Sequence, residues 1–318
     1  MNRFWKSLRG WIQPEVSVVT DKGGPWPLLA GLPGWQIVAP GGHPRARRVF
    51  RYQAEKGFDV GRVEQRLPAP PVAGSLAVVT LFAGRRTSLP GWIEFLLGAE
   101  LAPQTTLYLV DNSGQEEFHT ILKGAAARLG EARPELKLRI LQWGKPHPCR
   151  PGESYVEPGK HHHVAGLYRQ LWPMLEEDLW LTLEDDVVPP LSAYTTLAAE
   201  LRGPVGVVCA AYGDPYRPGP WVCAADQRFR KLTWNQAGSE IRPVAYVGGG
   251  CSLWSASAVR NLVPSCTQEG SLMGWDWNLC RDLRGIGWSV LLHGGVRCQH
   301  GVPAGGLAQQ AEVTHQPE

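Results

Sequence analysis

Apolar runs of strand length alternate along the chain with segments of helical spacing. Four apolar runs are expected to be strands, at residues 76–82 (LAVVTLF), 105–113 (TTLYLVDNS), 136–143 (LKLRILQW) and from 179 (LWLTLEDD). The segments between them include LPGWIEFLLGAEL, EEFHTILKGAAARL and HHHVAGLYRQLWPMLEE, the last interrupted near Pro173. Near-continuous apolar strands that alternate with helices are typical of a mostly parallel sheet flanked by helices. The pattern predicts an α/β fold.

The same pattern divides the chain into three parts. Proline and glycine gather at 67–74 (LPAPPVAG), which indicates a boundary. We therefore expect an N-terminal basic extension or small accessory segment at 1–73, an α/β domain at 74–302 and a disordered tail at 303–318. No apolar run is long enough for a transmembrane segment, and the first residues do not resemble a secretory signal.

Composition narrows the class of protein. With 43% hydrophobic and 19% charged residues, the chain is an ordinary globular sequence. Its 7 cysteines are scattered and form no CxxC pair, which argues against a disulfide scaffold or a structural zinc site. A reducing, cytoplasmic location is expected, in the host cytoplasm if the protein is viral.

Positive charge is concentrated in the N-terminal part. Residues 1–73 hold 11 Lys and Arg against 5 Asp and Glu, a balance of +6, whereas the remaining residues have a balance of −3. The excess peaks at Arg45, Arg47, Arg48 and Arg51. The simpler interpretation is a solvated segment, and the alternative is a surface that binds phosphate, as in nucleic acid.

Carboxylates follow two of the predicted strands. Glu184, Asp185 and Asp186 end the fourth strand, and Asp111 ends the second. Ligands of open α/β sheets bind at the carboxyl ends of the strands. Adjacent carboxylates repel one another unless a cation compensates, and Mg²⁺ or Mn²⁺ prefers oxygen ligands. The sequence therefore indicates a divalent metal site, with a solvated turn as the alternative.

Three further motifs are candidates for chemistry. Gly248, Gly249 and Gly250 form a run that allows close approach of the backbone to another group. Asp276 stands between two tryptophans, where partial burial would suit a proton acceptor. His300 ends a strand-like run and is a possible metal ligand.

Together, LAVVTLFAGRR, LYLVDNS, LTLEDDVVPP, GGGCSLW, GWDWNLC and RCQH, in this order, resemble the GT-A fold glycosyltransferases that use nucleotide sugars, most nearly the inverting, family-2-like type. The resemblance covers roughly residues 74–302. It implies a metal-dependent enzyme that moves a sugar from a nucleoside-diphosphate sugar, most commonly a UDP-sugar, to an acceptor hydroxyl.

The resemblance also implies roles for individual residues. Metal ligands would be Asp186, in a DXD-type motif, and His300, with Glu184 in a supporting role. Asp276 would be the general base. The donor would be bound by Thr80, Phe82, Asp111 and Asp185, and by Arg169 or one of the basic residues at 160–163, where relatives often carry Asn or Arg.

Other functions stay open at this point. A sugar nucleotidyltransferase shares the α/β layout, but LFAGRRTSLP has a single glycine where its phosphate loop should be glycine-rich. A non-catalytic module that binds nucleotide sugars or carbohydrates is the third alternative. The acceptor would be a glycan or, as in some viral DNA modification, a hydroxymethylated base in DNA bound through Arg45, Arg47, Arg48 and Arg51.

Overall fold

The computed structural model describes residues 74–143, 158–213, 219–266 and 274–301, with side chains from 161 onward in the second range, and the backbone of four strands before them. Those four strands are β1 (Ser17–Thr20), β2 (Gln36–Val38), β3 (Arg48–Gln53) and β4 (Gly57–Arg62), which pair in the order β2-β1-β3-β4. Arg45, Arg47 and the side chains of Arg48 and Arg51 lie outside the described residues, as does the predicted tail at 303–318. The predicted roles of these segments stay predictions.

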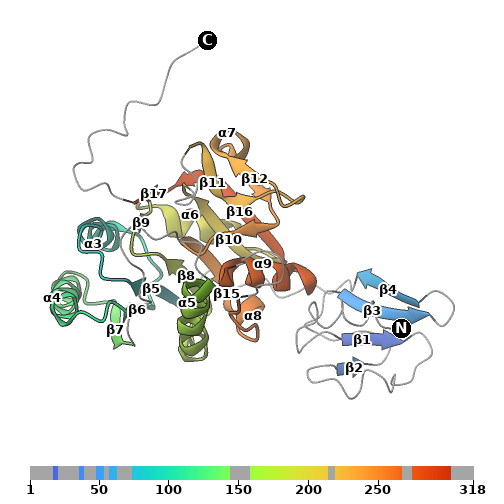
Figure 1. The fold of residues 1–318 in the computed structure, drawn as a ribbon, viewed down its shortest axis with the longest axis horizontal. Helices are drawn as coiled ribbons and strands as arrows, with labels where there is room; N and C mark the ends of the chain where they lie inside the picture. The colour runs from blue at the N-terminus through green and yellow to red at the C-terminus, as the bar shows by residue number, and fades with distance from the viewer. Residues whose placement is uncertain are drawn as a thin grey trace, which may run out of the picture.

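An eight-stranded sheet forms the centre of the described domain (Figure 1). Its order is β13-β16-β10-β15-β8-β5-β6-β7. The strands are β5 (Leu76–Phe82), β6 (Thr105–Asp111), β7 (Lys137–Gln142), β8 (Leu179–Leu183), β10 (Val205–Ala211), β13 (Ile241–Pro243), β15 (Cys251–Ser255) and β16 (Ser289–Arg297). Only β15 and β13 run antiparallel to their neighbours. The predicted mostly parallel α/β sheet is confirmed.

Helices flank this sheet, as predicted. They are α3 (Leu89–Gly98), α4 (Glu116–Ala132), α5 (Pro158–Leu171), α6 (Ala193–Glu200), α8 (Ala256–Val259) and α9 (Trp275–Gly285). Pro173 ends α5 as expected, because the next residues form the 3₁₀ helix η1 (Trp172–Met174). Within the described part, no helix is long and apolar enough to cross a membrane.

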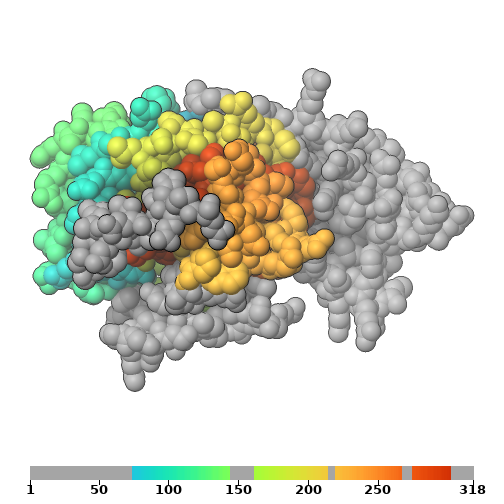
Figure 2. All heavy atoms as spheres, turned by 90° about the horizontal axis from the view of Figure 1, so that it is seen from above, coloured from blue at the N-terminus to red at the C-terminus, as the bar shows by residue number. Residues whose placement is uncertain are grey.

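Two small sheets complete the domain. The first contains β12 (Lys231–Thr233), β11 (Trp221–Ala225) and β14 (Tyr246–Val247). The short helix α7 (Trp234–Ala237) follows β12 directly in the sequence. Residues of this segment, coloured orange, reach the surface on the face shown in Figure 2. The second is the pair β9 (Val187–Val188) and β17 (Gln299–His300), in which His300 lies opposite Val187. This pairing brings the end of the described chain beside the acidic end of β8.

The core holds most of the tryptophans that the structure describes. Trp172 packs edge-on against Trp180, with ring centroids 4.7 Å apart. Trp275, the first residue of α9, lies 3.9 Å from the Tyr168 ring of α5. This packing fixes the start of α9 against α5, and with it the position of Asp276 at the next residue. All six described cysteines are free, in agreement with the absence of a predicted disulfide framework.

Candidate functional site

The candidate site is built at the carboxyl ends of β5 and β8. These strands are parallel neighbours, so the residues that follow them meet at one edge of the sheet. Asp185 is buried there and accepts a hydrogen bond from the backbone N–H of Ala83, just after β5, at 2.9 Å. The prediction that the carboxylates after β8 lie at a ligand-binding edge of the sheet is therefore consistent with their position.

Arg85 provides a cation that balances two of these carboxylates. Its guanidinium forms an ion pair with Asp185 and another with Asp186 Oδ2, the latter at 2.8 Å. Burial raises the pKa of Asp185 to about 6, and Arg85 limits that rise. Arg85 belongs to the LFAGRR motif after β5, and no role is predicted for it from the sequence.

His300 lies on the other side of Asp186. Its Nε2 is 3.7 Å from Asp186 Oδ1, while its Nδ1 is 2.6 Å from the carbonyl oxygen of Gly213. Only an Nδ1–H can donate to that carbonyl, so Nε2 is the nitrogen directed toward Asp186. Burial acts to lower the pKa of His300, but Asp186 outweighs this effect and the pKa is raised.

Glu184, Asp186 and His300 form a set of possible metal ligands. One oxygen or nitrogen atom of each lies within 4.8 Å of the others. Two ligands about 2.1 Å from the same ion are at most about 4.2 Å apart, and the 3.7 Å between Asp186 Oδ1 and His300 Nε2 meets this limit. The two carboxylates suit Mn²⁺ or Mg²⁺, whereas the imidazole is a ligand more usual for Zn²⁺, Cu²⁺, Fe²⁺ or Ni²⁺. The residues therefore fit a divalent ion, and Glu184 belongs to the possible ligand set rather than only supporting it.

The electrostatics of the set also favour a cation. Burial, with Asp186 close by, raises the pKa of Glu184 to about 8. Burial acts in the same direction on Asp186, but His300 and Arg85 outweigh it and lower its pKa. Without a metal, Glu184 is therefore protonated at neutral pH. A bound divalent ion would displace that proton, because the ion stabilises the charged carboxylate.

Asp276 approaches the same region from the first turn of α9. Its Oδ1 accepts the backbone N–H of Trp277 at 2.8 Å, and its Oδ2 accepts the backbone N–H of Gly249 at 3.1 Å. Burial raises its pKa, and these two N–H groups oppose the rise. Burial raises the pKa of Tyr168, and the negative charges of Glu184 and Asp276 add to the rise. Asp276 likewise adds to the rise in the pKa of Glu184, so the two carboxylates influence each other electrostatically.

The three glycines allow the backbone to approach the side chains of Tyr212 and Trp275 closely. A Cβ on Gly249 would collide with the Trp275 ring, and a Cβ on Gly250 would lie 2.8 Å from the Tyr212 ring. The N–H of Gly250 donates to the Tyr212 hydroxyl at 2.8 Å, and the Tyr212 ring packs edge-on against His300. The close approach expected of this run is thus made to aromatic rings of the protein itself.

The side chains of Thr80 and Phe82 are directed into the core. Thr80 is fully buried, and its hydroxyl accepts from the indole N–H of Trp92 at 3.2 Å. Phe82 packs against Trp92 with ring centroids 5.0 Å apart. Both side chains thus contact Trp92, and neither contacts the acidic cluster, by which we mean Glu184, Asp185 and Asp186. A donor contact at this strand end would therefore involve the residues that follow, from Ala83 onward.

Asp111 is also buried and engaged. Its Oδ1 accepts the N–H of Ser113 at 2.9 Å, and its Oδ2 lies 2.8 Å from Nδ1 of His119. Asn112, the next residue, contacts Nε2 of His163 on α5 at 2.9 Å. The structure thus gives Asp111 a role in shaping the loop after β6, which carries Asn112 toward α5.

Arg169 lies away from the acidic cluster. Its side chain is exposed, and its Nε donates to the carbonyl of Pro264 at 3.4 Å. His161, two turns earlier in α5, lies close enough to Asp276 to oppose the rise in the pKa of that carboxyl. His161 is therefore nearer to Asp276 than Arg169 is.

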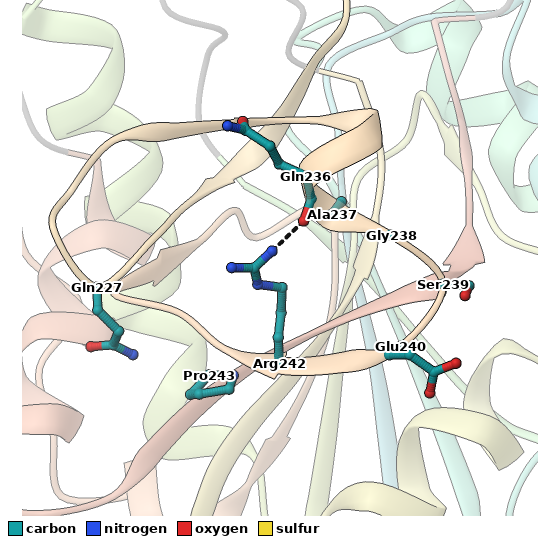
Figure 3. A pocket seen from close by; sticks show the side chains of 8 residues that line it. All are labelled: Gln227, Gln236, Ala237, Gly238, Ser239, Glu240, Arg242 and Pro243. Atoms are coloured by element: carbon teal, nitrogen blue, oxygen red, sulfur yellow. Dashed lines mark hydrogen bonds between the residues drawn. The ribbon is translucent and has the colours of Figure 1, made fainter.

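A separate pocket lies beside β13, the outermost strand at one side of the sheet (Figure 3). Arg242 occupies its centre and donates to the carbonyl of Gln236. The Nε of Arg242 is buried without a hydrogen-bond partner. Glu240 also lines this pocket, so the site holds charges of both signs. None of the predicted site residues lines it.

Replacing Arg85 with Gln is expected to destabilise the metal-free protein by about 2 kcal/mol, because Asp185 would remain buried without its counter-ion. The measurement is thermal unfolding in EDTA. Arg86→Gln is the matched control, since Arg86 forms an exposed pair with Glu117 and should cost less than about 1 kcal/mol. Equal losses in the two variants would contradict a special role for Arg85.

Comparisons with known proteins give similarity of fold only. No protein-family model and no curated protein matches the sequence. A mannosyltransferase from Pyrobaculum calidifontis, solved with GDP-Man and Mn²⁺, matches with a TM-score of 0.49 and 14% identity, over 76% of this chain and 61% of that one. GalNAc-T7, solved with UDP, GalNAc and Mn²⁺, matches with a TM-score of 0.46 and 12% identity, over 72% and 43% of the two chains. The protein A197 from STIV matches with a TM-score of 0.40, 13% identity, and 72% and 86% coverage. The chain thus spans about three fifths of the length of the mannosyltransferase.

Proposed function

We propose that this protein is a metal-dependent glycosyltransferase that moves a sugar from a nucleoside-diphosphate sugar to an acceptor hydroxyl. The observation that carries the proposal is the arrangement at one edge of the sheet. A possible metal-ligand set, Glu184, Asp186 and His300, lies near a further partly enclosed carboxylate, Asp276, that is not a member of the set. The metal-ligand set would serve the leaving diphosphate, and Asp276 would serve the attacking hydroxyl.

Glu184, Asp186 and His300 would hold Mn²⁺ or Mg²⁺, which when bound neutralises negative charge on the diphosphate. Arg85 keeps Asp185 in place and pairs with Asp186 Oδ2, so that Asp186 Oδ1 is the oxygen directed toward His300. Asp185 has no oxygen in the possible ligand set. We assign it to the positioning of the loop after β5, through the N–H of Ala83.

Asp276 would accept the proton of the acceptor hydroxyl as that oxygen attacks the anomeric carbon. Its raised pKa brings it closer to the value that suits a general base at neutral pH. A single displacement of this kind, with the base on the side of the acceptor, inverts the anomeric centre. UDP is the first nucleotide to test, because it is the commonest donor nucleotide in the family that the sequence motifs resemble.

Two observations weigh on the alternatives. In a sugar nucleotidyltransferase, the basic residues after the first strand would face a phosphate, whereas here Arg85 pairs with Asp185 and Asp186, and Arg86 pairs with Glu117. A binding module without catalysis would have no need for Asp276 near the metal set. The alternative acceptor, a hydroxymethylated base in DNA, rests on Arg45, Arg47, Arg48 and Arg51, whose side chains lie outside the described residues.

Thermal unfolding with UDP, GDP, CDP and dTDP, each with Mn²⁺ or with EDTA, tests the proposal. One nucleotide is expected to raise the unfolding midpoint only when Mn²⁺ is present, because specific binding stabilises the native state by mass action. Incubation of that nucleotide's sugar donor with candidate acceptors then measures transfer. No metal-dependent rise with any of the four nucleotides would overturn the proposal.

A further inference from the structure

Three aromatic side chains are stacked beside Asp276, and we refer to Phe229, Trp277 and Tyr246 as the aromatic ladder. The ring centroids of Phe229 and Trp277 are 5.3 Å apart with an interplanar angle of 32°. Those of Tyr246 and Trp277 are 4.8 Å apart at 39°. The tilted rings contact one another in turn and link β14, α9 and the turn between β11 and β12, and of the three only Phe229 is exposed.

The inner end of the aromatic ladder is hydrogen-bonded to the proposed base. The Tyr246 hydroxyl donates to Asp276 Oδ2 at 3.3 Å, and the backbone N–H of Trp277 donates to Asp276 Oδ1 at 2.8 Å. The ladder therefore runs from Asp276, at Tyr246 and Trp277, to Phe229 at its other end.

The outer end of the ladder is an apolar ring held at the surface. Phe229 is 50% exposed and has a φ of +61°, a left-handed conformation that is unfavourable for a bulky side chain. The turn is well fixed, because the Asp226 carboxylate accepts the N–H groups of Arg228 and Arg230 at 2.8 and 2.9 Å. The Arg284 guanidinium lies 5.4 Å from the centre of the Phe229 ring. A strained backbone that keeps a large ring exposed points to a use for the ring outside the protein's own core.

We propose that the aromatic ladder is the acceptor subsite and that it binds a carbohydrate ring by stacking; this rests on the proposed glycosyltransferase function. One face of a pyranose ring presents C–H groups, which pack favourably on aromatic faces, while its hydroxyls stay directed outward. Stacking on the exposed Phe229 ring would direct the acceptor along the half-buried Trp277 side chain toward Asp276. The ladder would thus select the acceptor and orient it toward the base.

The charges around the ladder favour a carbohydrate over a nucleic acid. Arg230 pairs with Asp226 at 2.7 Å, Arg284 donates to the Gln227 side chain at 3.0 Å, and the Lys231 ammonium lies over the Tyr246 ring at 5.6 Å. Binding to a phosphate backbone depends on cations that can replace counter-ions along the strand. Here three neighbouring cations are already engaged with groups of the protein.

The test measures binding of maltopentaose, cellopentaose, chitopentaose and mannopentaose by titration calorimetry, with UDP and Mn²⁺ present. Phe229→Gly removes the ring at a backbone conformation that suits glycine, so this variant should fold. Phe229→Trp keeps an aromatic face. Leu97→Ala is the matched control, because Leu97 is also an exposed apolar residue, 42% exposed, but lies on α3.

Wild type is expected to bind one of the four oligosaccharides, Phe229→Gly to bind it about 5- to 10-fold more weakly, and Phe229→Trp and Leu97→Ala to bind it within about twofold of wild type. Equal affinity of wild type and Phe229→Gly would overturn the inference, as would the absence of binding to all four oligosaccharides. Binding of a duplex that contains hydroxymethylcytosine in place of the oligosaccharides, lost in Phe229→Gly, would overturn the carbohydrate assignment. Nucleotide binding with Mn²⁺ is measured separately, so a failure of the proposed function is recognised independently.

Discussion

Asp276→Asn is expected to reduce the rate of sugar transfer by about 10²- to 10⁴-fold, because the amide cannot accept the proton of the attacking hydroxyl. The Oδ1 atom of Asn can still accept one backbone N–H, so the first turn of α9 should keep its structure. The measurement is the turnover number at saturating donor and acceptor, once the donor has been identified.

A measurement of nucleotide binding distinguishes the loss of the general base from damage to the whole site. The metal-dependent rise in the unfolding midpoint should be the same in Asp276→Asn and in wild type, because Asp276 is not in the possible metal set. Glu116→Gln is the control, since Glu116 is an exposed acid in the first turn of α4. Full activity of Asp276→Asn would falsify its assignment as general base.

Asp186→Ala is expected to abolish the metal-dependent binding of the nucleotide, with affinity reduced by about 100-fold or more. The substitution removes the oxygen nearest to His300 Nε2 and one of the two carboxylates that pair with Arg85. At a nucleotide concentration about 100-fold above the wild-type Kd, a 100-fold loss of affinity would remove about 2.3 of the roughly 2.7 kcal/mol of ligand-induced stabilisation. The readout is the unfolding midpoint with and without Mn²⁺.

The matched control for this variant is Glu117→Ala. Glu117 pairs with Arg86, the neighbour of Arg85 in the loop after β5. The Glu117 side chain is exposed and is not a member of the possible metal-ligand set. Its nucleotide response should equal that of wild type. A retained Mn²⁺-dependent response in Asp186→Ala would mean that the acids after β8 are a charged turn balanced by Arg85, and not a metal site.

Much of the central sheet could be predicted from the sequence. The apolar run at 76–82 coincides with β5, and the runs at 105–113 and 136–143 contain β6 and β7 within one or two residues at each end. β5 and β6 are buried along almost their whole length, so their sequences are largely apolar and stand out from the helices. β7 is the edge strand and is partly exposed, so its apolar residues alternate with Lys137, Arg139 and Gln142. The prediction that Asp111 ends β6, and that Glu184, Asp185 and Asp186 follow β8, agrees with the strand boundaries.

The direction of individual side chains could not be predicted in this way. In a strand covered on both faces, apolar residues do not reveal which side faces a ligand, and Thr80 and Phe82 were assigned to the donor although their side chains lie in the core. Arg85 was not recognised as a partner of Asp185 because its contact spans about a hundred residues of sequence. Glu184 was given only a supporting role, since the pairing of β9 with β17 that brings His300 close was not visible in the sequence.

The two-residue pairing of β9 with β17 has a consequence for how the site is assembled. Glu184 and Asp186 belong to the middle of the chain, whereas His300 arrives on the last strand of the described domain. A growing polypeptide therefore presents two acids long before it presents the imidazole, and Arg85, which precedes all of them, is available first as their neutralising partner. All three groups of the possible ligand set are thus present only after residue 300 has been synthesised.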